Sequence, residues 1–209
     1  MTESTTRVEA FSDGVFAIAI TLLILEIRVP EEGLANGASL AVSLAHLWPS
    51  YVAFLLSFFV LLVTWMNHHE LMRLVRVVDY QFLFANGFVL LTVTFTPFPT
   101  AVLAQHLATA QATTAAAFYC GTFVVVSIAW CLLLVSITRR NRLRHGTDAI
   151  VARRIGRAYF AAPLVYAFAT VVAFYNVVAG LAINFSLWVL WLLLCYRAAR
   201  PEEPGEHHR

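Results

Sequence analysis

The chain has 209 residues, of which 60% are hydrophobic and 12% are charged, and its formal net charge is +2. An ordinary soluble domain carries about 25% charged residues, so this composition, with a mean hydropathy of +0.76, argues against a soluble globular protein. Several apolar runs reach the length of about 18 residues that a membrane-spanning helix needs, and alternating strand patterns are absent. The fold class expected is an all-α membrane protein.

Six apolar runs predict six helices, because backbone amides in lipid must be hydrogen-bonded within the chain. The expected spans are 11–27, 46–68, 80–103, 115–137, 158–176 and 180–196. The polar lead, Met1 to Ala10, is short and no cleavage site follows it, so the first span is expected to stay in the mature protein. Asn176 to Gly180 is the expected turn between the last two spans.

Residues 1–197 are expected to form one six-span unit, and residues 198–209 a disordered, Pro- and Glu-rich tail. The chain has no lysine, and all of its arginines except Arg28 fall on one side of the expected spans. The positive-inside rule places that side, and with it both termini, in the cytoplasm. The basic loop RRNRLRHGTDAIVARRIGR is interpreted as an orientation anchor with some lipid contact rather than a nucleic-acid site.

Enzymatic signatures are absent from the sequence. His68 and His69, in the stretch WMNHHE, are adjacent and therefore diverge by about 100° on a helix, which makes a shared metal ion difficult. HExxH, CxxC, G-x-S-x-G and Gly-rich phosphate motifs do not occur. The three cysteines lie inside apolar runs and are interpreted as small buried side chains. The sequence therefore predicts neither an enzyme nor a metal site.

The first apolar run carries two kinds of residue on different faces. At about 100° per residue, an apolar stripe follows one face of the helix, whereas Asp13 lies nearly opposite it. The stripe consists of Gly14, Ile18, Thr21, Leu22 and Leu25. Packing or lipid contact is the ordinary explanation of such a stripe in a membrane helix.

Asp13 sits just inside the apolar run, and a charge in a membrane span requires a partner. Polar residues of the second and third runs fall on the same side of the membrane. The expected network joins Arg7, Ser12, Asp13, His68 or His69, and Asn86, and the expected scaffold also includes Phe11 and Gly14. Such a network would hold the first helix in one rotation, so that Gly14 and Ile18 face a specific environment.

The opening motif, Arg7-x-x-x-Phe11-Ser12-Asp13-Gly14, resembles the signature of the transmembrane protein 175 family, the lysosomal potassium channels and their bacterial relatives. The stretches TLLILEIRVP, WMNHHEL and FLFANGFVLLTVTFTPFPT extend the resemblance over most of the first half of the chain. The second half is similar only in its pattern of spans. The motif is fairly specific, because polar residues recur at fixed spacing in an apolar context.

The resemblance implies a multi-pass protein of the cell membrane, a homotetramer without cofactors, nucleic-acid partners or bound metal, that conducts potassium. The first helix of each subunit is then expected to line a central pore. Ile18 is implied as the constriction, with further apolar layers at Leu22 and Leu25, and Thr21 as the hydroxyl linked to potassium preference. Animal members carry a serine where this chain has Ala17, so potassium selectivity is expected to be weak.

Glu26 lies on the flank of the stripe near the expected outer mouth. It is expected either to concentrate cations there or to form a local pair with Arg28 or an intersubunit contact. A secondary transporter is the main alternative to a channel, although such folds usually show inverted repeats and helices broken near the midplane, which the sequence lacks. A non-conducting sensor or scaffold is a second alternative, and a membrane enzyme a third.

Overall fold

The computed structural model describes residues 3–30, 39–138 and 146–199, and their side chains over 5–30, 39–138 and 156–194. Every long element is a helix. In chain order they are α1 (Glu3–Leu22), η1 (Leu23–Glu26), α3 (Leu40–His46), α4 (Trp48–Arg73), α5 (Tyr80–Phe95), α6 (Pro97–His106), α7 (Ala112–Thr138), α8 (Gly146–Tyr175) and α9 (Val177–Ala199). Most of the expected tail, 200–209, lies outside the described residues.

Six segments of the described chain are long and apolar enough to cross a membrane, as predicted. They are Thr5–Glu26, Trp48–Arg73, Tyr80–His106, Ala112–Thr138, Gly156–Tyr175 and Val177–Leu194. Their bounds differ from the expected ones at the polar ends, because a helix continues past the apolar residues that define it in the sequence. The second span begins at Trp48, after the separate short helix α3, and runs on past His68 and His69 to Arg73.

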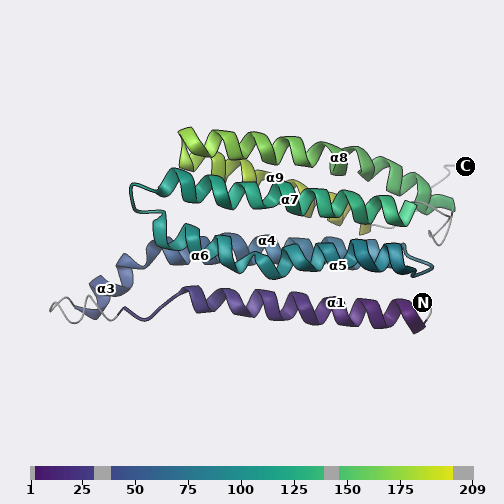
Figure 1. Ribbon diagram of the computed structural model, residues 1–209, viewed down its shortest axis with the longest axis horizontal. Coiled ribbons are helices and arrows are strands. Elements are labelled where there is room, and N and C mark those ends of the chain that lie inside the picture. The colour runs from purple at the N-terminus through teal and green to yellow at the C-terminus, as the bar shows by residue number, and fades with distance from the viewer. Residues whose placement is uncertain (1–2, 31–38, 139–145, 200–209) are drawn as a thin grey trace, which may run out of the picture.

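The helices run side by side in a layered bundle (Figure 1). α1 lies along one side and packs on α4 and α5, whereas α7, α8 and α9 form the opposite side. α1 begins and α9 ends at the same end of the bundle (Figure 1), as an even number of spans requires. The buried core lies between α4, α5, α6, α7, α8 and α9. The first span contributes Phe16 and Ala19 from α1 and Leu23 from η1.

The third span is broken at Thr96 into α5 and α6. Pro97 has no N–H and opens the second helix, the position at which a helix tolerates proline. Thr96 bridges the break, since its N–H donates to the Val93 carbonyl at 3.2 Å and its hydroxyl donates to the Thr92 carbonyl at 3.0 Å. A break inside a membrane span is tolerated when the freed backbone groups find such partners.

The turn between α8 and α9 is shorter than expected. Only Asn176 lies outside the two helices, and its side-chain oxygen accepts a hydrogen bond from the Ala179 N–H at 2.9 Å, which caps α9. Gly180, expected in the turn, lies inside α9. A Cβ atom added to Gly180 would sit 2.5 Å from the Ala173 Cβ. The glycine is therefore where α8 and α9 approach closely, and the expected turn of Asn176 to Gly180 is corrected to one residue.

Candidate functional site: the exposed face of α1

α1 has one face that packs on the rest of the chain. Ser12, Phe16, Ala19 and Leu23 are all buried to within about 1% exposure. Their spacing of three and four residues is that of a single helical face. Because this face is fixed against α4 and α5, the opposite face of α1 has a defined direction in the molecule.

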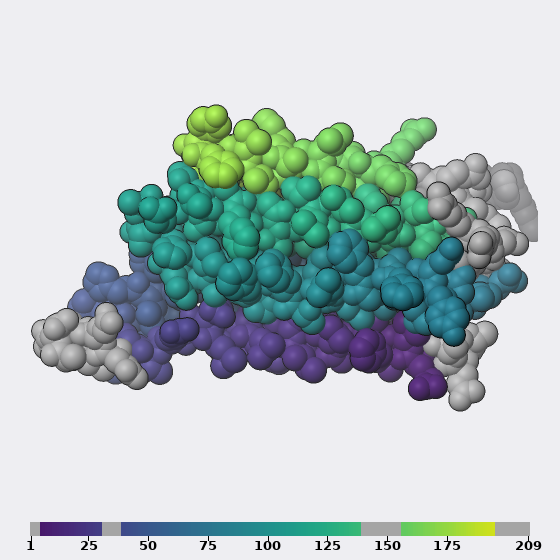
Figure 2. All heavy atoms as spheres, viewed as in Figure 1, coloured from purple at the N-terminus to yellow at the C-terminus, as the bar shows by residue number. Residues whose placement is uncertain are grey.

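The opposite face is uncovered along its whole length. Ile18 is 61% exposed, Leu22 44% and Leu25 66%, and Gly14 and Thr21 are exposed beside them. Figure 2 shows α1 forming one edge of the molecule, with no other part of the described chain outside it. The structure brings together the five residues of the stripe on one surface, which we call the α1 face. Phe11, 66% exposed, lies at its basic end.

Helix α1 tightens at its last turn into the 3-10 segment η1, and Ile27 is extended, with φ −92° and ψ 91°. Leu25 lies within η1 and remains exposed, whereas Leu23 is buried. Glu26, the last residue of η1, is half-buried. Neither a hydrogen bond nor an ion pair joins Glu26 to Arg28, although both lie in the described part of the chain, so the local pair is not formed.

Thr21 forms a hydrogen bond with its own helix. Its hydroxyl donates to the carbonyl of Ile18 at 2.9 Å. A hydroxyl has one proton to donate and two lone pairs that accept. Since the hydroxyl proton is bonded within the helix, Thr21 can only accept hydrogen bonds from, or coordinate, a molecule or ion next to the α1 face.

A chain of hydrogen bonds ties the buried face of α1 to α5 and α4. The Ser12 hydroxyl donates to the Val8 carbonyl at 2.8 Å and accepts from Asn86 Nδ2 at 3.1 Å. His68 Nε2 lies 2.7 Å from Asn86 Oδ1, and because an amide oxygen only accepts, Nε2 is the donor. His68 is fully buried and packs against Phe16, with ring centroids 5.3 Å apart. Ser12, Asn86 and His68 thus lie together, and His68 rather than His69 joins them.

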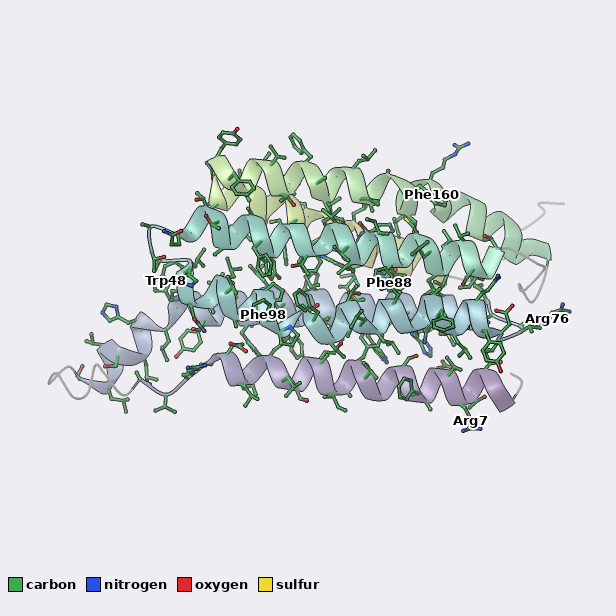
Figure 3. The ribbon with its side chains drawn as sticks, viewed as in Figure 1. Arg7, Trp48, Arg76, Phe88, Phe98 and Phe160 are labelled. Carbon is green, nitrogen blue, oxygen red and sulfur yellow. The ribbon has the colours of Figure 1, made fainter. Side chains whose placement is uncertain are left out.

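Asp13 has a different partner from those expected. Its Oδ1 accepts a hydrogen bond from the Trp65 indole N–H at 2.9 Å. No hydrogen bond or ion pair connects Asp13 with Arg7 or with either histidine, all of which the structure describes. Figure 3 shows the Arg7 side chain pointing away from the bundle at the end of α1. Asp13 and Arg7 are six positions apart, so about 120° separates them around the helix, a signal that the sequence already contained.

His69 pairs with Glu9, a residue that sequence reasoning did not select. Its Nδ1 lies 3.2 Å from Glu9 Oε1. Glu9 lies on the α4 side of α1, one turn before Asp13. α4 therefore holds α1 at two successive turns, through His69 and through Trp65. Within the residues described, no group of three or more His, Cys, Asp or Glu side chains is placed to hold a metal ion.

Comparison with known proteins decides the family. A family model described as endosomal/lysosomal potassium channel TMEM175 matches residues 7–97. The chain is 45% identical over 190 residues to a potassium channel of Chamaesiphon minutus. The aligned region covers 88% of this chain and 94% of that channel. The chain belongs to the TMEM175 family. A potassium channel of Streptomyces collinus is 44% identical over 156 residues, 74% of this chain and 75% of its own length.

The likeness extends to the three-dimensional structure. The crystal structure of a lysosomal potassium-selective TMEM175 homologue from Chamaesiphon minutus superposes with a TM-score of 0.84 at 41% identity, covering 95% of this chain and 100% of that chain. The resemblance inferred from the opening motif is thus confirmed, and it holds for the second half as well. TMEM175 is a family of ion channels, not of enzymes, and this chain is a multi-pass membrane protein with six apolar helices.

Proposed function

We propose that this chain is a passive, potassium-preferring cation channel and that the α1 face lines its pore. The observation that carries the proposal is the α1 face itself. α1 is held in one rotation by polar bonds on one side, and its other side presents an uncovered apolar stripe that includes one hydroxyl. The relatives reported above are named potassium channels.

A pore requires more than one copy of this chain. α1 lies at the edge of the subunit, so a single chain encloses nothing on that side. In a homotetramer with α1 innermost, the four α1 faces meet around an axis normal to the membrane. This arrangement covers the stripe and gives it an aqueous neighbour instead of lipid. The arginine distribution favours cytoplasmic termini for a protein inserted in the cell membrane.

Ile18 forms the constriction of this pore. Four isoleucine side chains on an axis create a dry segment, and apolar constrictions gate by excluding water. Leu22 and Leu25 add apolar layers toward the outer mouth. A small dilation or rotation of α1 wets the segment, and no ligand or cofactor other than the permeant ion is needed.

Thr21 supplies the potassium preference. Its hydroxyl oxygen points acceptor electrons at the ion, because the proton is bonded to the Ile18 carbonyl. Four such oxygens replace part of the hydration shell of a cation, and few, flexible ligands give modest selectivity. Ala17 offers no additional hydroxyl beside them.

The hydrogen bonds beneath α1 act as a positioning scaffold. Ser12 is held from α5 through Asn86, and Asp13 is held from α4 through Trp65. Adjacent residues point about 100° apart on a helix. Hydrogen bonds to both Ser12 and Asp13 therefore fix the rotation of α1 more firmly than a single hydrogen bond would. Arg7, Phe11 and Gly14 lie on the other side, at the cytoplasmic end of the pore. Glu26 lies at the outer mouth, where four carboxylates concentrate cations.

Reconstitution in planar bilayers, with potassium on one side and sodium on the other, tests the proposal. Channel-sized currents that reverse toward the potassium equilibrium potential are expected. Large currents that reverse at zero would keep the channel and remove the selectivity assigned to Thr21. A saturating flux far below channel rates, from an intact tetramer, would favour the secondary transporter instead.

A further inference from the structure

A small cavity, mostly apolar in its lining but with several polar groups on its wall, lies behind the α1 scaffold, between α4, α7, α8 and α9. Its walls are mostly aromatic, with Trp130 from α7, Tyr159 and Tyr166 from α8, and Trp188 and Trp191 from α9. α4 contributes Thr64 and Asn67, and α7 contributes Ser127. No residue of the α1 face lines this cavity, so the pore does not account for it.

Two polar groups on the cavity wall have no acceptor for their proton within the described chain. They are the Tyr166 hydroxyl and the Trp188 indole N–H. Tyr166 is 2% exposed and Trp188 is 4% exposed, so neither reaches bulk water or lipid headgroups. A buried polar group left without a hydrogen bond costs about 1–3 kcal/mol, and two on one cavity point to a missing partner.

Three other polar side chains on the wall supply acceptors. The Thr64 hydroxyl donates to the Val60 carbonyl at 2.7 Å, and the Ser127 hydroxyl donates to the Val124 carbonyl at 2.8 Å. Both hydroxyl protons are therefore bonded within α4 and α7, and the oxygen lone pairs remain free to accept a hydrogen bond. Asn67 likewise donates through Nδ2 to the Val63 carbonyl at 2.8 Å, which leaves its side-chain oxygen.

From this pattern we propose that the cavity is a binding site for one ordered water molecule. The cavity leaves about 20 Å³ for the centre of a water molecule, above the roughly 10–15 Å³ that one water requires. Water accepts from the Trp188 N–H and from the Tyr166 hydroxyl, and it donates to an oxygen of Thr64, Ser127 or Asn67. Its two lone pairs and two protons match the groups on the wall.

A monovalent cation fits the site less well. Aromatic faces attract cations, but no carboxylate lines the cavity, and the charge would be buried without a counter-charge. The two unpartnered groups also include the Trp188 N–H, which is a donor only and repels a cation. A neutral molecule that both donates and accepts is the occupant that satisfies the wall.

The water site joins the scaffold of α1 to the rear of the subunit. Thr64 and Asn67 flank Trp65, whose indole holds Asp13 of α1. On the far side, Tyr166 belongs to α8 and Trp188 to α9. The bound water therefore bridges the stretch of α4 that positions α1 to the helices behind it.

Radiolytic footprinting of the reconstituted protein tests the site, since hydroxyl radicals formed from ordered water oxidise adjacent side chains. Tyr166 and Trp188 are expected to be oxidised several-fold faster than Tyr119. Tyr119 is a matched control, because it is 1% exposed and its hydroxyl is bonded to Ser57 at 3.1 Å. Protection of Tyr166 and Trp188 equal to that of Tyr119 would overturn the proposal.

A second measurement uses the sign of a stability change. In Tyr166→Phe a hydroxyl bonded to water is lost, so the melting temperature is expected to fall, and oxidation of Trp188 is expected to fall with it. If the cavity is dry, removal of an unpartnered hydroxyl raises the melting temperature instead. Anomalous density from thallium in the cavity would identify a cation site and would likewise overturn the proposal of a water site.

Discussion

The indole nitrogen of Trp65 lies 2.9 Å from a carboxylate oxygen of Asp13 and donates a hydrogen bond to it. This bond gives the one acidic residue within the apolar part of α1 a neutral donor rather than a counter-ion. It also fixes α1 against α4 on the side opposite the α1 face.

Trp65→Phe keeps an aromatic ring and removes the donor. A hydrogen bond to a charged group contributes about 1.5–3 kcal/mol, and we expect the lower end because Asp13 is only partly buried. The melting temperature of the assembled protein should fall, and Asp13→Asn, which keeps an acceptor oxygen, should be milder than Asp13→Ala. Trp48→Phe, at a half-exposed tryptophan, is the control. An unchanged melting temperature in Trp65→Phe would remove the structural role of this bond.

Ile18→Asn is expected to raise single-channel conductance several-fold. In the proposed constriction an amide would hold water where four isoleucines would exclude it. Single-channel recording in planar bilayers measures this directly. Ile24→Asn makes the same chemical change at an exposed residue outside the α1 face and should leave conductance unaltered. Equal conductance in Ile18→Asn and the native channel would show that the gate lies elsewhere.

Thr21→Val removes the hydroxyl and keeps the side-chain volume. The permeability ratio of potassium to sodium should fall toward one, and Thr21→Ser should retain it. Reversal potentials under bi-ionic conditions report the ratio. Thr94→Val is closely matched, because Thr94 is also exposed and donates to the carbonyl three residues earlier at 2.9 Å, but on α5. An unchanged permeability ratio of potassium to sodium in Thr21→Val would contradict the role of Thr21 in selectivity.

Glu26→Gln should lower conductance at low ionic strength and have little effect at high ionic strength. The Debye length falls from about 30 Å at 0.01 M salt to about 3 Å at 1 M, so the attraction of the proposed carboxylate ring would be screened. Conductance measured across this range separates the two roles of Glu26. A loss of the same size at every salt concentration would indicate a structural role in place of an electrostatic one.

Gly180→Ala should destabilise the α8–α9 hairpin. The added methyl would meet the Ala173 Cβ at 2.5 Å, and overpacking of this kind costs about 1–3 kcal/mol. Ala173→Gly in the same chain should restore little of the melting temperature, because the backbone Cα and N of residue 173 would still lie 2.6 and 2.8 Å from the added methyl. Gly87→Ala is the control, since nothing lies within 4 Å of the added methyl there. Tolerance of Gly180→Ala without the second change would mean that the helices separate easily.

Hydropathy and helical periodicity predicted much of this architecture. The six spans follow from composition because lipid leaves the backbone no alternative to helices. The α1 face follows from the 100° step, since Ile18, Leu22 and Leu25 recur at the helical spacing. The grouping of Ser12, Asn86 and a histidine followed from the need of buried polar groups for partners.

Other features depend on distances that a sequence pattern does not contain. Trp65 belongs to an apolar run, and nothing in its spacing distinguishes an indole N–H that meets a carboxylate from one that faces lipid. The pairing of His69 with Glu9 depends on the crossing of α1 and α4. Gly180 was expected in a turn because glycine often marks one, whereas here its missing side chain permits a close approach to Ala173.

The hydrogen bond from Thr21 to the carbonyl of Ile18 has a consequence for the sign of the permeant ion. Each hydroxyl dipole points its negative end away from the helix, so in the proposed tetramer a ring of four would present a negative potential without any formal charge. Chloride would meet oxygen lone pairs and find no proton to bind. Such a ring would keep anions out over the whole range of pH in which the helix is intact, because it holds nothing that titrates.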